Sequence, residues 1–150
     1  MTLAIHQIAP DFTLPSTSGD MFSLEEDAKG KSCILFFYPK DFTRGCTQEV
    51  CKFRNAYSFF KGLNMDIWGI SRDTIISHLK FKEKHCLPFD LLSDKDGRVC
   101  KMYGALMPIL RWPKRVTYLL DNKHIIKGVY QDLFHAHRHI DHMVNVLDVT

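Results

Sequence analysis

The run from Cys33 to Tyr38, CILFFY, constrains the fold more than any other part of the sequence. It is continuously apolar, half of it is aromatic, and Pro39 ends it. A short apolar run without alternation is typical of a strand buried on both faces, as in the sheets of α/β proteins. The sequence therefore predicts a central strand with packing layers above and below it.

The next segment changes to helical periodicity. Apolar side chains recur at intervals of three and four and stop before Gly62; they are Cys46, Val50, Phe53, Tyr57 and Phe60. This spacing predicts a helix of about four turns. Thr43 is the expected N-cap, because its hydroxyl can accept from the N–H of Gly45 or Cys46; it can also face an oxygen of a bound peroxide.

Short strand and helix patterns alternate along the rest of the chain. They predict strands at 65–70 and 89–92, helices at 73–85, 99–103 and 135–147, and hairpins pairing 12–14 with 21–24 and 116–120 with 124–130. Such β-α-β-α order implies a largely parallel sheet covered by helices. We predict a thioredoxin-like α/β fold, with a central mixed sheet flanked by helices and an N-terminal β-hairpin. A flavodoxin-like arrangement fits the same order of elements.

Length and charge limit the function classes. With 150 residues, 45% of them hydrophobic, the chain is expected to form one domain, 1–150. Its 20 basic and 17 acidic residues are interspersed and leave a net charge of +3, so we expect neither a nucleic-acid partner nor a membrane surface. The first residues lack a signal-peptide pattern, and no run approaches the ~20 apolar residues of a membrane span. We expect a cytoplasmic protein with a small polar substrate.

The number and spacing of the cysteines indicate a function based on thiol chemistry. The chain has five: Cys33, Cys46, Cys51, Cys86 and Cys100. An odd count at irregular spacing argues against a disulfide framework in a reducing compartment and favours free or catalytic thiols. Cys33 is expected to be buried in the central strand. Neither a C-x-x-C motif nor the paired spacing of a zinc site is present, so we expect no metal at the thiols.

Cys46 falls where the end of a strand meets the start of a helix. There, unpaired backbone N–H groups and the helix dipole favour an anion. An ordinary thiol is about three per cent ionised at pH 7, so a reactive Cys46 needs its pKa lowered by roughly two to three units, about 3 to 4 kcal/mol. A helix terminus supplies about 0.3 to 1 kcal/mol, up to about 2. A cation is therefore expected nearby, and Arg115, just ahead of the run VTYLL, is the candidate.

Cys51 follows Cys46 by five positions. On an ideal helix it lies about 140° around from Cys46, away from the apolar face. The two Cα atoms would be roughly 8 to 9 Å apart, beyond the ~7 Å limit for a disulfide. If the two sulfurs pair, the first helical turns must unwind.

The segment FFYPKDFTRGCTQEVCKFR closely resembles the active-site segment of the peroxiredoxin Q subfamily, also called bacterioferritin comigratory proteins. The proline-x-x-x-threonine-x-x-cysteine pattern of that family falls on Pro39, Thr43 and Cys46, and its resolving cysteine falls on Cys51. Four more segments resemble the family in the expected order: APDFTL, GISRD, FDLLSDKDG and RVTYLLD. The active-site arginine of the family maps onto Arg115.

The resemblance implies a thioredoxin-like fold and a thiol peroxidase in antioxidant defence that reduces hydrogen peroxide and organic hydroperoxides without a cofactor. Cys46 would attack the peroxide and become a sulfenic acid, while Arg115, Thr43 and the backbone N–H of Cys46 stabilise charge on the oxygens. Cys51 would then form an intramolecular disulfide that thioredoxin, or a similar dithiol, reopens. Relatives in this subfamily are often monomers, so we expect a monomer.

Several residues keep two interpretations. Pro39 either ends the strand or also shields the sulfur from water. Arg44 stands where family members commonly carry proline, and it either tunes Cys46 or points to solvent. Arg111 competes with Arg115 for the arginine position. Cys86, expected to pack or to lie at the surface like Cys100, is the alternative resolving thiol.

Two further hypotheses come from other classes. The spacing of His135, His139 and His142 fits one face of the last helix, where three imidazoles could bind a metal; solvated, unreactive histidines are the default expectation. The chain could also be a redox-dependent binding module or holdase whose disulfide changes a surface without peroxide turnover. Steady peroxide consumption with a thioredoxin system separates that hypothesis from a peroxidase.

Overall fold

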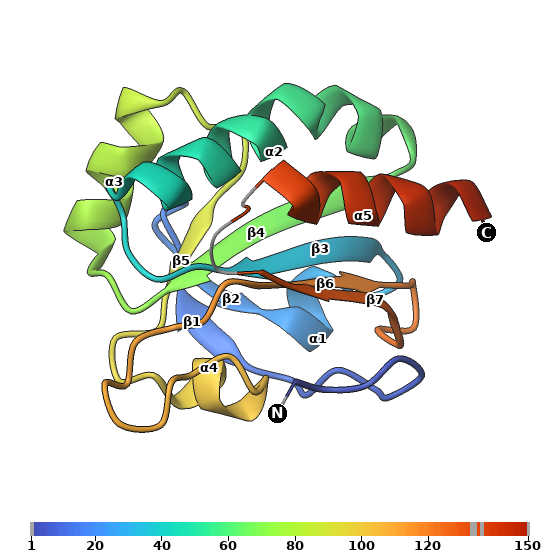
Figure 1. The fold of residues 1–150 in the computed structure, drawn as a ribbon, viewed down its shortest axis with the longest axis horizontal. Helices are drawn as coiled ribbons and strands as arrows, with labels where there is room; N and C mark the ends of the chain where they lie inside the picture. Colours follow the sequence, from blue (N-terminus) through green and yellow to red (C-terminus); the bar gives the residue numbers. More distant parts are fainter. Residues whose placement is uncertain (1, 133–134, 136, 150) are drawn as a thin grey trace.

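A computed structural model describes residues 2–132, 135 and 137–149. Its centre is a five-stranded sheet in the order β5-β4-β3-β6-β7 (Figure 1). The strands are β3 (Ser32–Phe37), β4 (Met65–Ser71), β5 (Leu91–Ser93), β6 (Val116–Leu120) and β7 (Ile126–Gln131). β3, β4 and β5 run parallel, whereas β6 and β7 add antiparallel. The sheet is therefore mixed, as predicted.

Helices and a small hairpin cover the two faces of this sheet (Figure 1). The remaining elements are β1 (Thr13–Pro15), β2 (Met21–Ser23), α1 (Leu24–Asp27), α2 (Arg44–Gly62), α3 (Ile75–Lys84), α4 (Arg98–Met102) and α5 (His137–Val149). α2 and α5 contact each other and lie on one face, while α1, α4 and the antiparallel β1–β2 pair lie on the other. The predicted N-terminal hairpin is confirmed.

The central strand β3 divides the apolar core in two. Its alternate side chains Cys33, Leu35 and Phe37 face the cluster formed by the hairpin, α1 and α4. The side chains that alternate with them, Ile34, Phe36 and Tyr38, face the cluster of α2, α3 and α5. Because successive strand residues point to opposite faces, burial of the whole run requires both layers. The prediction of a doubly buried strand is confirmed.

Most predicted boundaries shift by one or two residues, and two of these shifts have a clear structural cause. α3 begins at Ile75, not at residue 73, because Thr74 caps it by accepting from the N–H of Ser77 at 3.2 Å. β5 begins at Leu91, not at residue 89, because its parallel pairing with β4 starts with Gly69 opposite Leu91. The preceding Phe89 is still buried in the core.

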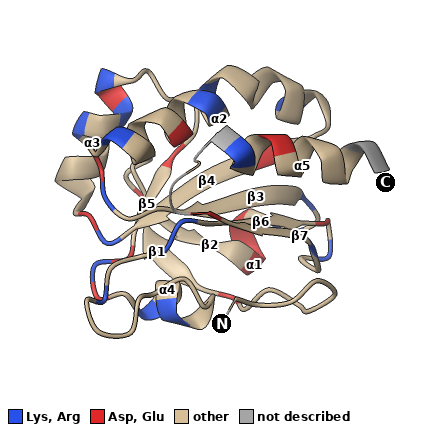
Figure 2. Cartoon of the chain, in the orientation of Figure 1, with Lys and Arg blue, Asp and Glu red and all other residues tan. Residues whose placement is uncertain are grey.

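Acidic and basic residues are spread over several helices and loops in the view of Figure 2 and are interspersed there, as they are in the sequence. Within the described part of the chain, none of the helices is long and apolar enough to cross a membrane.

Candidate active site

Cys46 lies in the first turn of α2, at the carboxyl end of β3. The connecting loop turns through Phe42, whose φ of 65° is in the left-handed region. Cys46 therefore lies beside the carboxyl end of β3 and is fully buried. The helix N-terminus at Cys46 is the one that the strand-loop-helix pattern predicts.

Arg115 reaches Cys46 from the neighbouring strand. β6 pairs antiparallel with β3, with Val116 opposite Phe37, so the residue before β6 lies beside the end of β3. Its guanidinium Nη2 donates to Cys46 Sγ at 3.3 Å. Gly45 permits this approach, because a Cβ there would lie 2.9 Å from Nη2. The predicted pairing of Arg115 with Cys46 is thus present in the structure.

A buried carboxylate, Glu49, shares the guanidinium with the thiol. Arg115 Nη1 donates to Glu49 Oε1 at 2.7 Å, and Glu49 is fully buried. Burial raises the pKa of Glu49 to about 8, although Arg115 opposes this shift. The sequence analysis did not identify Glu49 as a site residue. The only signal for it in the sequence is its position, one turn after Cys46 on the buried face of the helix.

The pKa of Cys46 differs from the expectation. Burial raises it above the ordinary thiol value, and Glu49 adds to this, whereas Arg115 and the hydroxyl of Thr43 lower it. Burial is the larger influence, so the predicted lowering of the Cys46 pKa is wrong for this structure.

His139 of α5 completes this cluster. It is fully buried, its Nδ1 lies 2.7 Å from Thr117 Oγ1, and its Nε2 lies 2.9 Å from the carbonyl of Asp132. Burial lowers the pKa of His139 to about 4, so the ring is neutral at pH 7. The expectation of a solvated histidine is wrong here, because α5 packs against α2 and β7. His135 instead contacts Asp132, and the ring of His142 lies against Tyr130.

Thr43 is the N-cap residue of α2 but makes no side-chain capping bond. Its hydroxyl donates to the carbonyl of Lys40 at 2.8 Å, closing the loop on itself. The predicted bond to Gly45 or Cys46 is therefore wrong, since the hydroxyl is directed backwards along the chain. The hydroxyl nevertheless acts to lower the pKa of Cys46.

The contacts of the candidate arginines, one of which lies near Pro39, show which of them reaches Cys46. Pro39 is half-buried and lines a pocket of about 220 Å³ with Lys40, Arg72, Asp73, Arg111, Trp112 and Pro113. Arg111 donates to the carbonyl of Asp96 at 3.2 Å, so its guanidinium is committed away from Cys46. Arg44 is exposed. Of these arginines, Arg115 is the one that contacts the thiol.

The remaining cysteines have different environments. Cys33 and Cys100 are fully buried, and burial raises the pKa of each thiol strongly, which makes them unreactive core residues. Cys51 is half-buried on α2, and its Sγ lies 3.8 Å from His85 Nδ1. Cys86 is exposed, just after α3, with a φ of 50°. All five sulfurs are free thiols.

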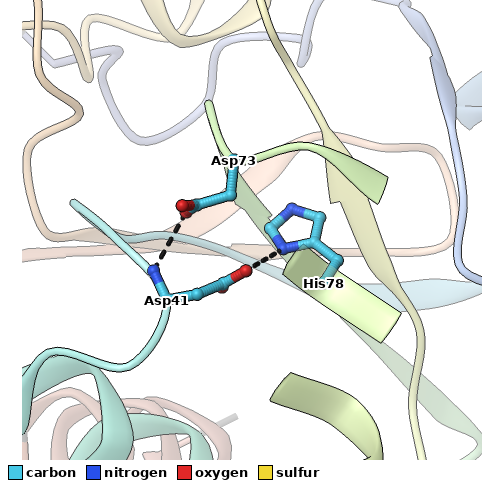
Figure 3. A group of neighbouring side chains, drawn as sticks. All are labelled: Asp41, Asp73 and His78. Atoms are coloured by element: carbon cyan, nitrogen blue, oxygen red, sulfur yellow. Dashed lines mark hydrogen bonds and ion pairs between the residues drawn. The ribbon is translucent and has the colours of Figure 1, made fainter. Parts of the chain in front are cut away.

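A second buried network anchors the loop before Cys46 (Figure 3). Asp41 Oδ2 lies 2.7 Å from His78 Nδ1, and the backbone N–H of Asp41 donates to Asp73 Oδ2 at 2.9 Å. Asp41 also accepts from Tyr38 and Ser77, at 2.6 and 2.8 Å. On the far side of the ring, His78 Nε2 lies 2.9 Å from the carbonyl of Leu92.

This group could be mistaken for a metal site, because ligand atoms of Asp41, Asp73 and His78 lie within 4.8 Å of one another. However, each of these side chains already has protein hydrogen-bond partners. Both ring nitrogens of His78 lie within hydrogen-bond distance of an oxygen, Asp41 Oδ2 on one side and the Leu92 carbonyl on the other. We interpret the group as an internal hydrogen-bond network that fixes the loop.

Comparison with known proteins places this geometry in a family. The model of the AhpC/TSA family matches residues 5–129. The chain belongs to this family. It is 45% identical over 136 residues to a peroxiredoxin bcp of Coxiella burnetii, covering 87% of this chain and 89% of that one. It is 39% identical over 142 residues to the chloroplastic peroxiredoxin Q of Populus jackii, covering 94% of this chain and 66% of the longer relative.

The solved structures agree. Peroxidoxin BcpB from Mycobacterium tuberculosis superposes with a TM-score of 0.90 at 30% identity, over 97% of this chain and 96% of that chain. The thioredoxin-like fold and the resemblance to peroxiredoxin Q are thereby confirmed. The protein is a peroxiredoxin, and peroxiredoxins are thiol peroxidases.

Proposed function

We propose that Cys46 is the peroxidatic nucleophile, that Cys51 is the resolving cysteine, and that Arg115 and Thr43 serve the peroxidatic step. The contact of 3.3 Å between Arg115 Nη2 and Cys46 Sγ carries this proposal. In this contact a permanent cation lies against a buried thiol at a helix N-terminus. The cation and the helix N-terminus both stabilise a thiolate.

In the first step, the thiolate sulfur of Cys46 attacks the terminal oxygen of the hydroperoxide. The S–O bond forms as the O–O bond breaks, Cys46 becomes a sulfenic acid, and the leaving oxygen takes a proton to give water or an alcohol. Arg115 and the backbone N–H of Cys46 stabilise the charge that moves onto the oxygens. Pro39 and the closed loop limit access of bulk water to the sulfur.

Glu49 and Cys46 compete for the single positive charge of Arg115. Because both are buried, two anions beside one guanidinium would leave a net buried negative charge, which is costly. The raised pKa of Glu49, about 8, allows it to be protonated at neutral pH. A protonated Glu49 leaves the guanidinium available to the Cys46 thiolate, so the two groups titrate as a coupled pair.

In the second step, Cys51 attacks the sulfur of the Cys46 sulfenic acid, and water leaves as the disulfide forms. The first turns of α2 unwind for this step, since five residues of helix hold the sulfurs apart. A dithiol reductant, thioredoxin or a similar protein, then reopens the disulfide. We further propose that the chain acts as one domain and as a monomer in the cytoplasm.

The test is peroxide consumption coupled to a thioredoxin system. Cys46→Ser is expected to lose turnover completely, because within the described residues Cys46 is the thiol that a guanidinium contacts. Cys51→Ser is expected to oxidise once and then stop, because its sulfenic acid has no partner thiol. Cys86→Ser is the matched control and should turn over like the wild type. Full turnover by Cys46→Ser would overturn the proposal, and loss of turnover in Cys86→Ser alone would move the resolving role to Cys86. A binding module or holdase would not consume peroxide in any variant.

A further inference from the structure

The proposed resolving thiol has a partner that the peroxidatic mechanism does not use. Cys51 Sγ lies 3.8 Å from Nδ1 of His85, within the range of a hydrogen bond to sulfur. The two residues come from different helices, 34 positions apart, and both are half-buried. His85 is the C-cap residue of α3, where its own N–H donates to the carbonyl of Phe81 at 3.2 Å.

The position of His85 is held from both helices. Arg54 of α2 donates through Nη1 to the His85 carbonyl at 2.9 Å, and the Phe81 ring packs edge-on against the imidazole with centroids 5.1 Å apart. Arg54 follows Cys51 by three residues, so the same turn of α2 carries the Cys51 thiol and the guanidinium that binds the His85 carbonyl. We call this contact between Arg54 and the His85 carbonyl the clamp. The imidazole therefore meets the thiol in a fixed geometry.

The charges around His85 favour its neutral form. The charged groups that face it are Arg54 on α2 and Lys84 on α3, both cations. Burial, followed by these two cations, lowers the pKa of His85 from its ordinary value. At neutral pH the ring is uncharged, and a neutral imidazole nitrogen can accept a proton from a thiol.

We propose that His85 is a catalytic general base for disulfide formation, taking the proton from the Cys51 thiol as that sulfur attacks Cys46. This inference rests on the proposed role of Cys51 as the resolving cysteine. It adds a second functional pair, Cys51–His85, to the peroxidatic pair Cys46–Arg115. The first pair acts on peroxide and the second acts on the sulfenic acid.

The step balances in atoms and charge. His85 Nδ1 takes the S–H proton, the Cys51 sulfur forms a bond to the Cys46 sulfur, and the S–O bond of the sulfenic acid breaks. The departing hydroxide takes a proton, directly from the imidazolium or through solvent, and leaves as water. The net change is one thiol and one sulfenic acid giving one disulfide and one water, so no external oxidant or base is required.

The same contacts indicate which part of α2 moves. The clamp from Arg54 to the His85 carbonyl holds the turn that carries Cys51 against the end of α3. Cys46 lies in the first helical turn, before this clamp. The Cys46 turn therefore unwinds and travels to Cys51, while Cys51 stays beside its base.

The test is a single turnover with one equivalent of hydrogen peroxide, quenched at short times and followed by intact mass. Sulfenic acid appears as a gain of one oxygen, and the disulfide as a loss of two hydrogens. In His85→Ala we expect unchanged formation of the sulfenic acid and a disulfide step slowed roughly 10²-fold at pH 7, the low end of what a positioned general base contributes. The difference should shrink as the pH rises, because hydroxide in solution then removes the thiol proton without the imidazole.

Three controls separate base catalysis from a structural role. His85→Gln keeps a polar side chain but no base, and should be as slow as His85→Ala. Added imidazole should restore the disulfide step of His85→Ala, which no structural defect would allow. Glu83→Gln, an exposed change on the same turn of α3, should leave both steps unchanged.

The outcomes also distinguish this inference from the proposed function. If the wild type forms the Cys46–Cys51 disulfide and His85→Ala forms it equally fast with the same pH profile, the role of His85 is wrong while Cys51 remains the resolving residue. If peptide mapping of the wild type finds Cys46 joined to Cys86, the resolving role of Cys51 itself is wrong, and this inference is overturned with it.

Discussion

Replacement of Arg115 by methionine is expected to slow the oxidation of Cys46 by hydrogen peroxide by about 10²- to 10³-fold, or about 2.7 to 4 kcal/mol, the usual loss for a donor to developing oxyanion charge. The guanidinium is the cation in contact with Cys46 Sγ, and it lowers the pKa of that thiol against the effect of burial. Methionine keeps much of the volume but removes both contributions. The measurement is the second-order rate constant of sulfenic acid formation under excess peroxide.

Arg111→Met is the matched control, because Arg111 is a nearby arginine whose guanidinium donates to the carbonyl of Asp96 and not to the thiol. It should oxidise at close to the wild-type rate. Glu49 should tolerate the loss of Arg115, because its raised pKa of about 8 allows it to be neutral. A loss of less than threefold in Arg115→Met, with the fold intact, would contradict the role given to the guanidinium.

Replacement of His78 by alanine is expected to destabilise the protein by about 3 kcal/mol, because it removes two buried contacts, to Asp41 and to the Leu92 carbonyl, and leaves these groups with fewer hydrogen-bond partners. For a chain of this length, such a loss lowers the Tm by about 10 °C. The loop that leads to Thr43 and Cys46 is then held by fewer contacts, so the rate of Cys46 oxidation should fall as well. Thermal unfolding monitored by circular dichroism gives the first number.

Ser77→Ala is the matched control for this change, because it removes one hydrogen bond to Asp41 but keeps the contact between Asp41 and His78. It should cost about 1 kcal/mol. A double-mutant cycle with Asp41→Asn and His78→Ala should give a coupling energy of at least about 1 kcal/mol, since the two side chains are in direct contact. Additive single effects, or a Tm of His78→Ala within 2 °C of the control, would show that the pair does not anchor the loop.

The sequence predicted those parts of the fold and site that depend on local pattern. The run CILFFY needed burial on two faces, and the structure supplies two packed clusters around β3. The start of a helix after a buried strand placed Cys46 correctly. Arg115 was anticipated from its place just ahead of the run VTYLL and from the family resemblance, whereas the pairing of β6 with β3 that brings it to the end of β3 is seen only in the structure.

Buried polar partners were not predictable, because they depend on which elements pack together. In the sequence Glu49 is one charged helix residue among several. Only the packing of the fold brings Arg115 and His139 close to it in the core. His139 appeared solvated because its helix seemed peripheral. His85 meets Cys51 only because the end of α3 lies against α2. Each partner lies more than twenty positions away, beyond the reach of spacing or periodicity.

The central claim is that Cys46 and Cys51 form the catalytic pair, and intact mass with peptide mapping of the wild type after one equivalent of hydrogen peroxide tests it most directly. The account predicts a loss of two hydrogens, a single peptide pair joining Cys46 to Cys51, and free thiols at Cys33, Cys86 and Cys100. A stable gain of oxygen without a disulfide, or a disulfide that excludes Cys46, would contradict it.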